Sequence, residues 1–232
     1  MIKYFIIASL GLLAAILWRN WARRRQLAYL EAFPYRQYLD QRLAARRPKL
    51  SEEQRDKIFV ALLDYFLICR RAGKRMVAMP SQAVDDAWHE FILFTRRYDK
   101  FCQAAFGRFL HHTPAEAMSS PTQASEGLRR AWRLACAHEG IHPQKPERLP
   151  RLFALDAELG IAGGFIYRLD CLAAGHAGTA DGFCASHIGC GGSSGCGGGG
   201  CSGDSGSSDG GGGSDGGGGG GCGGGCGGGG GD

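Results

Sequence analysis

The chain has no lysine or arginine after Arg168 and almost no apolar side chain after Ile188. Of its 39 glycines, 28 lie beyond Ile188, in a segment of glycine, serine, aspartate and cysteine. Folding such a segment would remove a large backbone entropy, and no buried apolar area would compensate for that loss. We therefore predict a disordered glycine- and cysteine-rich tail over residues 185–232, with no folded domain in it.

The sequence also lacks the cysteine pattern of a disulfide-stabilised domain. Five of its ten cysteines lie in the tail, while Cys69, Cys102 and Cys136 are solitary residues within helical patterns. A solitary cysteine in a helix usually packs as a small hydrophobic residue. The pattern therefore excludes a small disulfide-rich fold. For the tail cysteines, binding of soft metals, oxidation and attachment to other chains remain alternatives to a plain linker.

The net charge is +5, which raises the question of a nucleic-acid partner. Part of the excess comes from Arg19 and from Arg23 to Arg25, which follow an apolar run at the N-terminus. The other basic residues are spread among acidic ones, as on an ordinary solvated surface. We therefore do not expect this protein to bind nucleic acid.

The only long apolar run comprises residues 4–18 and is uncharged. As a helix it would span about 22 Å, and the interfacial Trp18 and Trp21 would extend it toward a hydrocarbon core of about 30 Å. A cleaved signal peptide is the alternative, but the sequence lacks a small-x-small cleavage site after the run. We predict a retained transmembrane anchor over residues 1–21.

The charges around this run also predict its orientation. Four arginines follow it closely, whereas one lysine precedes it. The positive-inside rule then places the rest of the chain in the cytoplasm. We predict a single-pass protein of the cell membrane whose partner is the bilayer itself, and whose cysteines stay reduced or bind metal.

Residues 26–184 have the composition of one mainly α, compact helical domain. Ser51 and Gln54 match a capping box at the start of one helix, and Gly73 is a suitable end for it. The stretch 165–172 is rich in strand-forming residues but has no evident pairing partner, so its structure stays open. Helical patterns cover residues 26–47 with an interruption near Pro34, residues 52–72, residues 124–139 and residues 151–159.

Residues 81–114 contain the richest combination of aromatic and polar side chains. Apolar residues recur there at alternating steps of three and four, which predicts one long amphipathic helix with Ser81 as its N-cap. We expect five residues of this stretch to be structural: Trp88, Tyr98, Cys102, Phe106 and Gly107. The predicted apolar stripe consists of Val84, Trp88, Phe91, Thr95, Tyr98, Cys102 and Phe106.

Four residues of this stretch form a candidate metal site. Asp85 and His89 are one helical turn apart, so their side chains can meet on one face. His111 and His112 follow after a turn and can fold back beside them. Two histidines and a carboxylate suit zinc or iron.

The same residues also fit a purely structural arrangement. In that interpretation Asp85 orients His89 or binds a backbone amide, and the histidine pair fastens a turn. Which arrangement holds depends on whether His111 and His112 reach the Asp85–His89 face, and spacing alone does not decide this.

Residues 138–142 match HExxH, the pattern of zinc proteases, which requires both histidines on one helical face. Here Gly140 lies within the required turn and Pro143 follows His142 directly. Proline disfavours a helical conformation at the preceding residue. We therefore expect the end of a helix and not a protease site.

A V-D-x-x-W-H segment in this chain is followed by a tyrosine, a cysteine, a Phe-Gly pair and a closing histidine. These positions are Val84, Asp85, Trp88, His89, Tyr98, Cys102, Phe106, Gly107 and His111 or His112. This order resembles the motif of the glycine-rich-domain-containing proteins, including their bacterial members. Residues 149–161 and the glycine-rich tail resemble those bacterial members as well. The resemblance implies that Asp85, His89 and His112 act together, and it implies no particular activity.

Two functions are compatible with these observations. The one that we expect is a membrane-tethered scaffold or interaction module without established catalysis. The second is a metal-dependent enzyme that uses Asp85, His89 and the His111–His112 pair. Stoichiometric bound zinc or iron would distinguish the second from the first.

Overall fold

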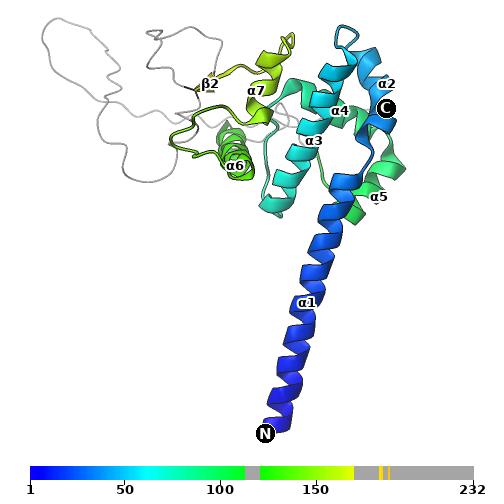
Figure 1. Cartoon of the computed structure of the whole chain (residues 1–232), viewed down its shortest axis with the longest axis vertical. Helices are drawn as coiled ribbons and strands as arrows, with labels where there is room; N and C mark the ends of the chain where they lie inside the picture. The colour runs from blue at the N-terminus through cyan, green and yellow to red at the C-terminus, as the bar shows by residue number, and fades with distance from the viewer. Residues whose placement is uncertain (113–120, 170–182, 185–187, 189–232) are drawn as a thin grey trace, which may run out of the picture. The chain divides into compact units, whose positions relative to one another are not determined.

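A computed structural model of the chain describes residues 1–112, 121–169, 183–184 and 188 (Figure 1). Within them lie seven helices and two very short strands, which confirms the prediction of a mainly α protein. The predicted tail lies outside the described residues, apart from Ile188. The helices are α1 (Ile2–Ala32), α2 (Tyr35–Arg46), α3 (Glu52–Ala72), α4 (Gln82–Ile92), α5 (Thr95–Phe106), α6 (Pro121–Glu139) and α7 (Arg151–Glu158).

Helix α1 is continuous through both the predicted anchor and the start of the helical domain. Residues 1–21 are exposed throughout, and Leu30 is the first buried side chain. The helix is long and apolar enough to cross a membrane. It ends at Ala32, because Pro34 holds the preceding Phe33 in an extended conformation. The predicted interruption near Pro34 is therefore confirmed.

Helix α3 contacts α1, α2, α4, α6 and α7, and so lies at the centre of the core. Its start is the predicted capping box: the Gln54 amide donates to Ser51 Oγ at 3.2 Å, and Gln54 Oε1 accepts from the Ser51 amide at 2.8 Å. It ends at Gly73, whose φ of 65° favours glycine. Both ends of this helix were thus predicted correctly.

An aromatic cluster joins the residue that caps the end of α1 to the next four helices. Its members are in contact, with ring centroids 4.7 to 6.4 Å apart. Rings at these separations combine a large buried area with favourable edge and offset geometry. The cluster consists of Phe33, Tyr35, Phe66, Phe91 and Phe101.

The prediction of one long helix after Ser81 is wrong. The chain forms α4 and α5, separated at Leu93 and Phe94, where Leu93 is 61% exposed. Residues ten apart in one helix are separated by about 15 Å along its axis, yet the rings of Phe91 and Phe101 are 4.9 Å apart. Packing both rings in the same core therefore requires the chain to fold back. The apolar spacing continues across the break, and the intervening Thr95 is exposed.

The stretch left open at residues 165–172 contributes strand β1 (Tyr167–Arg168), which pairs in parallel with β2 (Phe183–Cys184). Tyr167 is opposite Phe183, and Arg168 is opposite Cys184. The Tyr167 ring is buried and packs edge-on against Phe153 of α7. The buried Tyr167 ring therefore holds β1 against the helical core.

The aromatic cluster should dominate the stability of the domain. Phe66 is fully buried, so Phe66→Ala is expected to lower the free energy of unfolding by about 3–5 kcal/mol. The exposed Leu93 provides a control, because Leu93→Ala should change it by less than about 0.5 kcal/mol. Denaturant unfolding of the full chain in detergent, followed by tryptophan fluorescence, measures both. Equal effects of the two substitutions would contradict this core.

Candidate functional site

Helix α4 carries two of the candidate residues, and a buried carboxylate fixes its N-terminus. Asp156 of α7 is 2% exposed and accepts hydrogen bonds from Ser81 Oγ at 2.7 Å, the Gln82 amide at 2.7 Å and the Ala83 amide at 3.2 Å. Ser81 Oγ in turn accepts from the Val84 amide, as an N-cap should. The free amides at the start of α4 are thereby satisfied.

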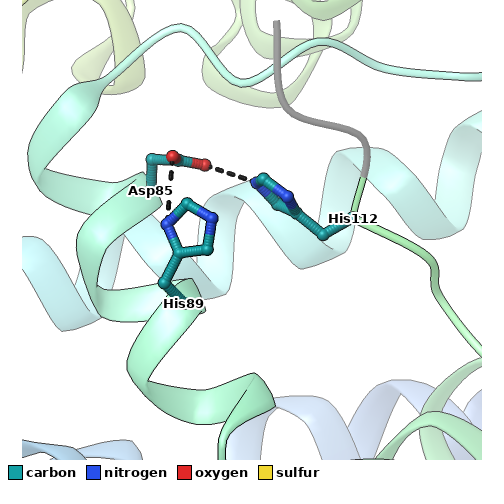
Figure 2. A group of neighbouring side chains, drawn as sticks. All are labelled: Asp85, His89 and His112. Atoms are coloured by element: carbon teal, nitrogen blue, oxygen red, sulfur yellow. Dashed lines mark hydrogen bonds and ion pairs between the residues drawn. The ribbon is translucent and has the colours of Figure 1, made fainter. Parts of the chain in front are cut away.

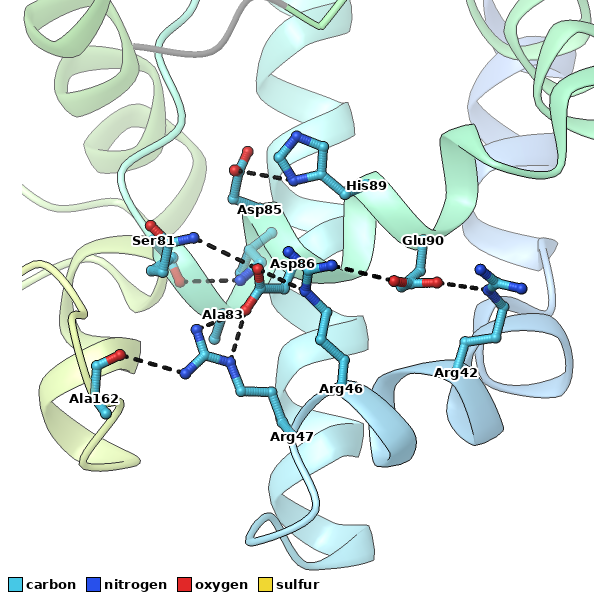
Figure 3. A network of polar contacts seen from close by, with 12 residues as sticks. Arg42, Arg46, Arg47, Ser81, Ala83, Asp85, Asp86, His89, Glu90 and Ala162 are labelled. Atoms are coloured by element: carbon cyan, nitrogen blue, oxygen red, sulfur yellow. Dashed lines mark hydrogen bonds and ion pairs between the residues drawn. The ribbon is translucent and has the colours of Figure 1, made fainter. Parts of the chain in front are cut away.

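The face of α4 toward α2 is held by a network of ion pairs (Figure 3). Asp86 contacts Arg46 Nε at 2.9 Å and Arg47 Nε at 2.7 Å. Glu90 contacts Arg42 Nε at 2.5 Å and Arg46 Nη1 at 3.4 Å. Both carboxylates are buried, and burial of a charge requires this kind of compensation. The network therefore fixes the rotation of α4 about its axis.

The loop after α5 is held against α4 by a hydrogen-bonded relay. Gly107 has a left-handed conformation and ends α5. Tyr98 Oη donates to the Leu110 carbonyl at 2.6 Å and accepts from Trp88 Nε1 at 3.0 Å. This relay through Trp88 and Tyr98 places the residues after Leu110 beside α4.

Asp85, His89 and His112 come together at the end of this loop (Figure 2). His112 Nε2 lies 2.7 Å from Asp85 Oδ1, and His89 Nδ1 lies 3.3 Å from Asp85 Oδ2. One ligand atom from each residue lies within 4.8 Å of the other two. The His112 ring also packs edge-on against Trp88, with centroids 4.5 Å apart. The site therefore combines two residues of α4 with one residue from the loop that follows α5.

His89 has an unsatisfied ring nitrogen in this arrangement. Its Nδ1 is close to Asp85, but the two are not aligned as a hydrogen bond, and the buried nitrogen has no hydrogen-bond partner. The side chain as a whole is 38% exposed, against 18% for Asp85 and 9% for His112. A buried polar atom without a partner is costly, so this geometry favours a ligand at Nδ1.

Two neighbouring residues, the candidate ligand His111 and the expected core residue Cys102, do not join the site. His111 is exposed, and its ring contacts Phe109 with centroids 4.8 Å apart. Cys102 is fully buried, and this burial raises the pKa of its thiol. Burial likewise raises the pKa of Cys69 to about 12, so both thiols stay protonated. Of the predicted histidine pair, only His112 reaches Asp85, and Cys102 belongs to the core.

The HExxH residues do not form a protease site. Helix α6 ends at Glu139, and Gly140 has a φ of 70°, so His142 lies beyond the helix. His138 Nε2 contacts Asp64 Oδ1 at 3.2 Å, and Glu139 pairs with Arg148 at 2.5 Å. The structure therefore confirms the expectation that this motif marks a helix end.

Sequence reasoning missed Asp156 and the arginines that position α4. Asp156 lies in the segment 149–161, for which the sequence predicts a short helix and a resemblance but no functional residue. A carboxylate that caps a helix from a distance of more than seventy residues has no local pattern. The sequence does predict Ser81 as the N-cap of this helix, and Asp156 contacts the same residue.

The comparisons with known proteins give a family but no activity. The model of the UCP032817-like family matches residues 25–188. The match covers most of the chain, which therefore belongs to this family. Neither the curated proteins nor the solved structures contain a match.

The relay through Tyr98 should control the position of His112. Tyr98→Phe leaves the Trp88 N–H and the Leu110 carbonyl without their partner, so we expect a loss of about 2–4 kcal/mol in unfolding free energy. It should also shift the His112 imidazole signals in NMR spectra. Tyr65→Phe is a matched control, since it removes a buried hydrogen bond to the Val77 carbonyl. It should cost stability but leave the His112 signals in place; unchanged stability in Tyr98→Phe would argue against the relay.

Proposed function

We propose that this member of the UCP032817-like family is a membrane-anchored domain that binds a divalent zinc or iron ion through Asp85, His89 and His112. The observation that carries the proposal is the convergence of three residues that each place one ligand atom within 4.8 Å of the other two, at a point where the buried Nδ1 of His89 has no hydrogen-bond partner. In a purely structural triad that nitrogen would have Asp85 Oδ2 as its polar neighbour, which lies 3.3 Å away without hydrogen-bond alignment.

The donor set fits this assignment. Two imidazoles and one carboxylate bind zinc in catalytic sites and form the facial triad of non-haem iron(II) enzymes. Both kinds of site keep coordination positions open for water or substrate. The partial exposure of His89 would give solvent access to such positions. We therefore favour a metal-dependent activity over the scaffold without catalysis.

The surroundings of the three residues support a preorganised site. Asp85 and His89 lie on a helix whose N-terminus and α2-facing side are both fixed by buried carboxylates. His112 is held by the Tyr98 relay and by the Trp88 ring. Ligands held in this way lose little freedom when they bind a metal, which raises the affinity.

Metal content tests the proposal directly. The full chain, purified in detergent, should carry about one zinc or iron per molecule in elemental analysis. Asp85→Asn, His89→Ala and His112→Ala should each lower that content at least tenfold, because each removes a ligand. Refilling the chelator-treated protein should raise its midpoint of thermal unfolding, since a ligand that binds only the folded state stabilises it.

His111→Ala is the matched control, because it removes the adjacent exposed histidine. It should keep the full metal content. A metal-free wild-type protein in which His89→Ala merely unfolds at a lower temperature would refute the metal site and favour the scaffold.

The proposed anchor and its orientation have a separate test. The chain should remain in the membrane after alkaline extraction, and its intact mass should include α1. A reporter enzyme active only in the cytoplasm, fused after Cys184, should be active. A well-expressed but silent fusion would reverse the orientation, and loss of the first residues would identify a signal peptide.

A further inference from the structure

Basic side chains from three separate segments meet where α1 enters the helical domain. Arg70, in the last turn of α3, donates from Nη2 to the Arg23 carbonyl at 2.5 Å and contacts Gln26 Oε1 at 3.4 Å. The C-terminal end of α3 thus lies directly beside residues 23–26 of α1.

The loop after α5 joins the same place. Arg108 donates to the carbonyl of Gly73, the residue that ends α3. A Cβ built on Gly107 would lie 3.4 Å from Gln26 Nε2, so this loop also borders α1. Residues 23–26, 70–74 and 107–108 therefore form one continuous surface.

This surface carries charge of one sign. The segments 19–30, 65–84 and 100–112 contain no aspartate or glutamate. They contain ten basic residues, and we call the eight nearest to the junction the basic collar. The basic collar consists of Arg23, Arg24, Arg25, Arg70, Arg71, Lys74, Arg75 and Arg108.

Within the collar, one of the guanidinium donors of Arg70 has no partner. Its Nε is buried and has no hydrogen-bond partner. Burial, and then the nearby Arg23, lowers the pKa of its guanidinium. The dipole of α3 favours Arg70 and Arg71 at its C-terminus, but it does not explain why further cations gather beside them. A cluster of like charges with an unsatisfied donor fits an anionic ligand.

The collar lies next to the apolar end of α1. The rings of Trp18 and Trp21 are 5.2 Å apart, and the Arg25 guanidinium lies over the Trp21 ring at 5.4 Å from its centroid. Tryptophans of this kind mark the membrane interface. Arg25 follows Trp21 by four residues, or about 6 Å along the helix. The collar would therefore lie at the level of the lipid headgroups.

We propose that the basic collar binds the anionic phospholipid headgroups of the membrane in which α1 is anchored. This inference rests on the proposed anchor, and it adds a surface of the folded domain to the membrane contact. Clusters of four to eight basic residues next to a transmembrane helix bind anionic lipids in this way. The collar would hold the domain against the bilayer surface.

Hydrogen exchange of the full chain in lipid nanodiscs tests the proposal. With 30 mol% phosphatidylserine at low salt, amides of residues 73–79 and 107–110 should exchange several-fold more slowly than in phosphatidylcholine alone. High salt should remove the difference, because the attraction falls off within a Debye length. The double substitution Arg71→Gln/Lys74→Gln should remove it as well, since both side chains are exposed.

The matched control is Lys49→Gln/Lys145→Gln, which removes two exposed cations elsewhere. Lys49 precedes α3, whose 21 residues extend for about 30 Å to the collar. This control should keep the full protection. Protection that is equal in both lipids, or lost equally in both double variants, would overturn the proposal.

Two further results distinguish lipid binding by the basic collar from the membrane anchor on which it rests and from nucleic-acid binding. Release of the chain by alkaline extraction would refute the anchor itself, whereas a retained chain without lipid-dependent protection would refute the collar alone. Salt-sensitive binding of duplex DNA to the protein in phosphatidylcholine discs, lost in Arg71→Gln/Lys74→Gln, would overturn it in favour of nucleic acid.

Discussion

The fold-back of the chain at Leu93 and Phe94 is the constraint on which the candidate site depends. It places α5 against α4, so that Trp88, Tyr98 and Leu110 can share hydrogen bonds. Without the fold-back, a continuous helix from residue 82 to residue 106 would extend about 37 Å. The loop carrying His112 would then leave the far end of that helix. The aromatic core that forces the turn thus also assembles the site.

Buried charges determine how precisely α4 is held. Asp86, Glu90 and Asp156 are almost fully buried, and each has two or more polar partners. Burial of a carboxylate has a large desolvation penalty, so such groups add little net stability over apolar packing. They do require one particular orientation, because any rotation of α4 would separate them from their partners. Their effect is to fix the orientation of α4. The adjacent Asp85 and His89 are thereby held in one orientation as well.

The sequence predicted those features that have a local physical cause. Ser51 and Ser81 were identified as caps, and the break at Pro34 follows from proline geometry. The break at Leu93 was missed because neither proline nor glycine marks it, and the apolar spacing continues across it. It arises from tertiary packing of Phe91 on Phe101, which no local pattern records.

For the candidate site, the sequence identifies the residues but does not predict how they are arranged. Asp85 and His89 were paired correctly from helical spacing, whereas the choice between His111 and His112 needed the loop geometry. Asp156 was missed, because its role comes from contacts with a distant helix.

The contrast between His111 and His112 bears on the nature of the site. The two are adjacent in sequence, yet one is exposed and the other is nearly buried between Trp88 and His89. A histidine that only fastened a turn would need one partner, and Asp85 already supplies it at 2.7 Å. The His89 ring lies beside it as well, with its centroid 4.3 Å from that of His112. Two imidazoles converge on one carboxylate here, and one ring nitrogen has no hydrogen-bond partner; the proposed metal site rests on this arrangement.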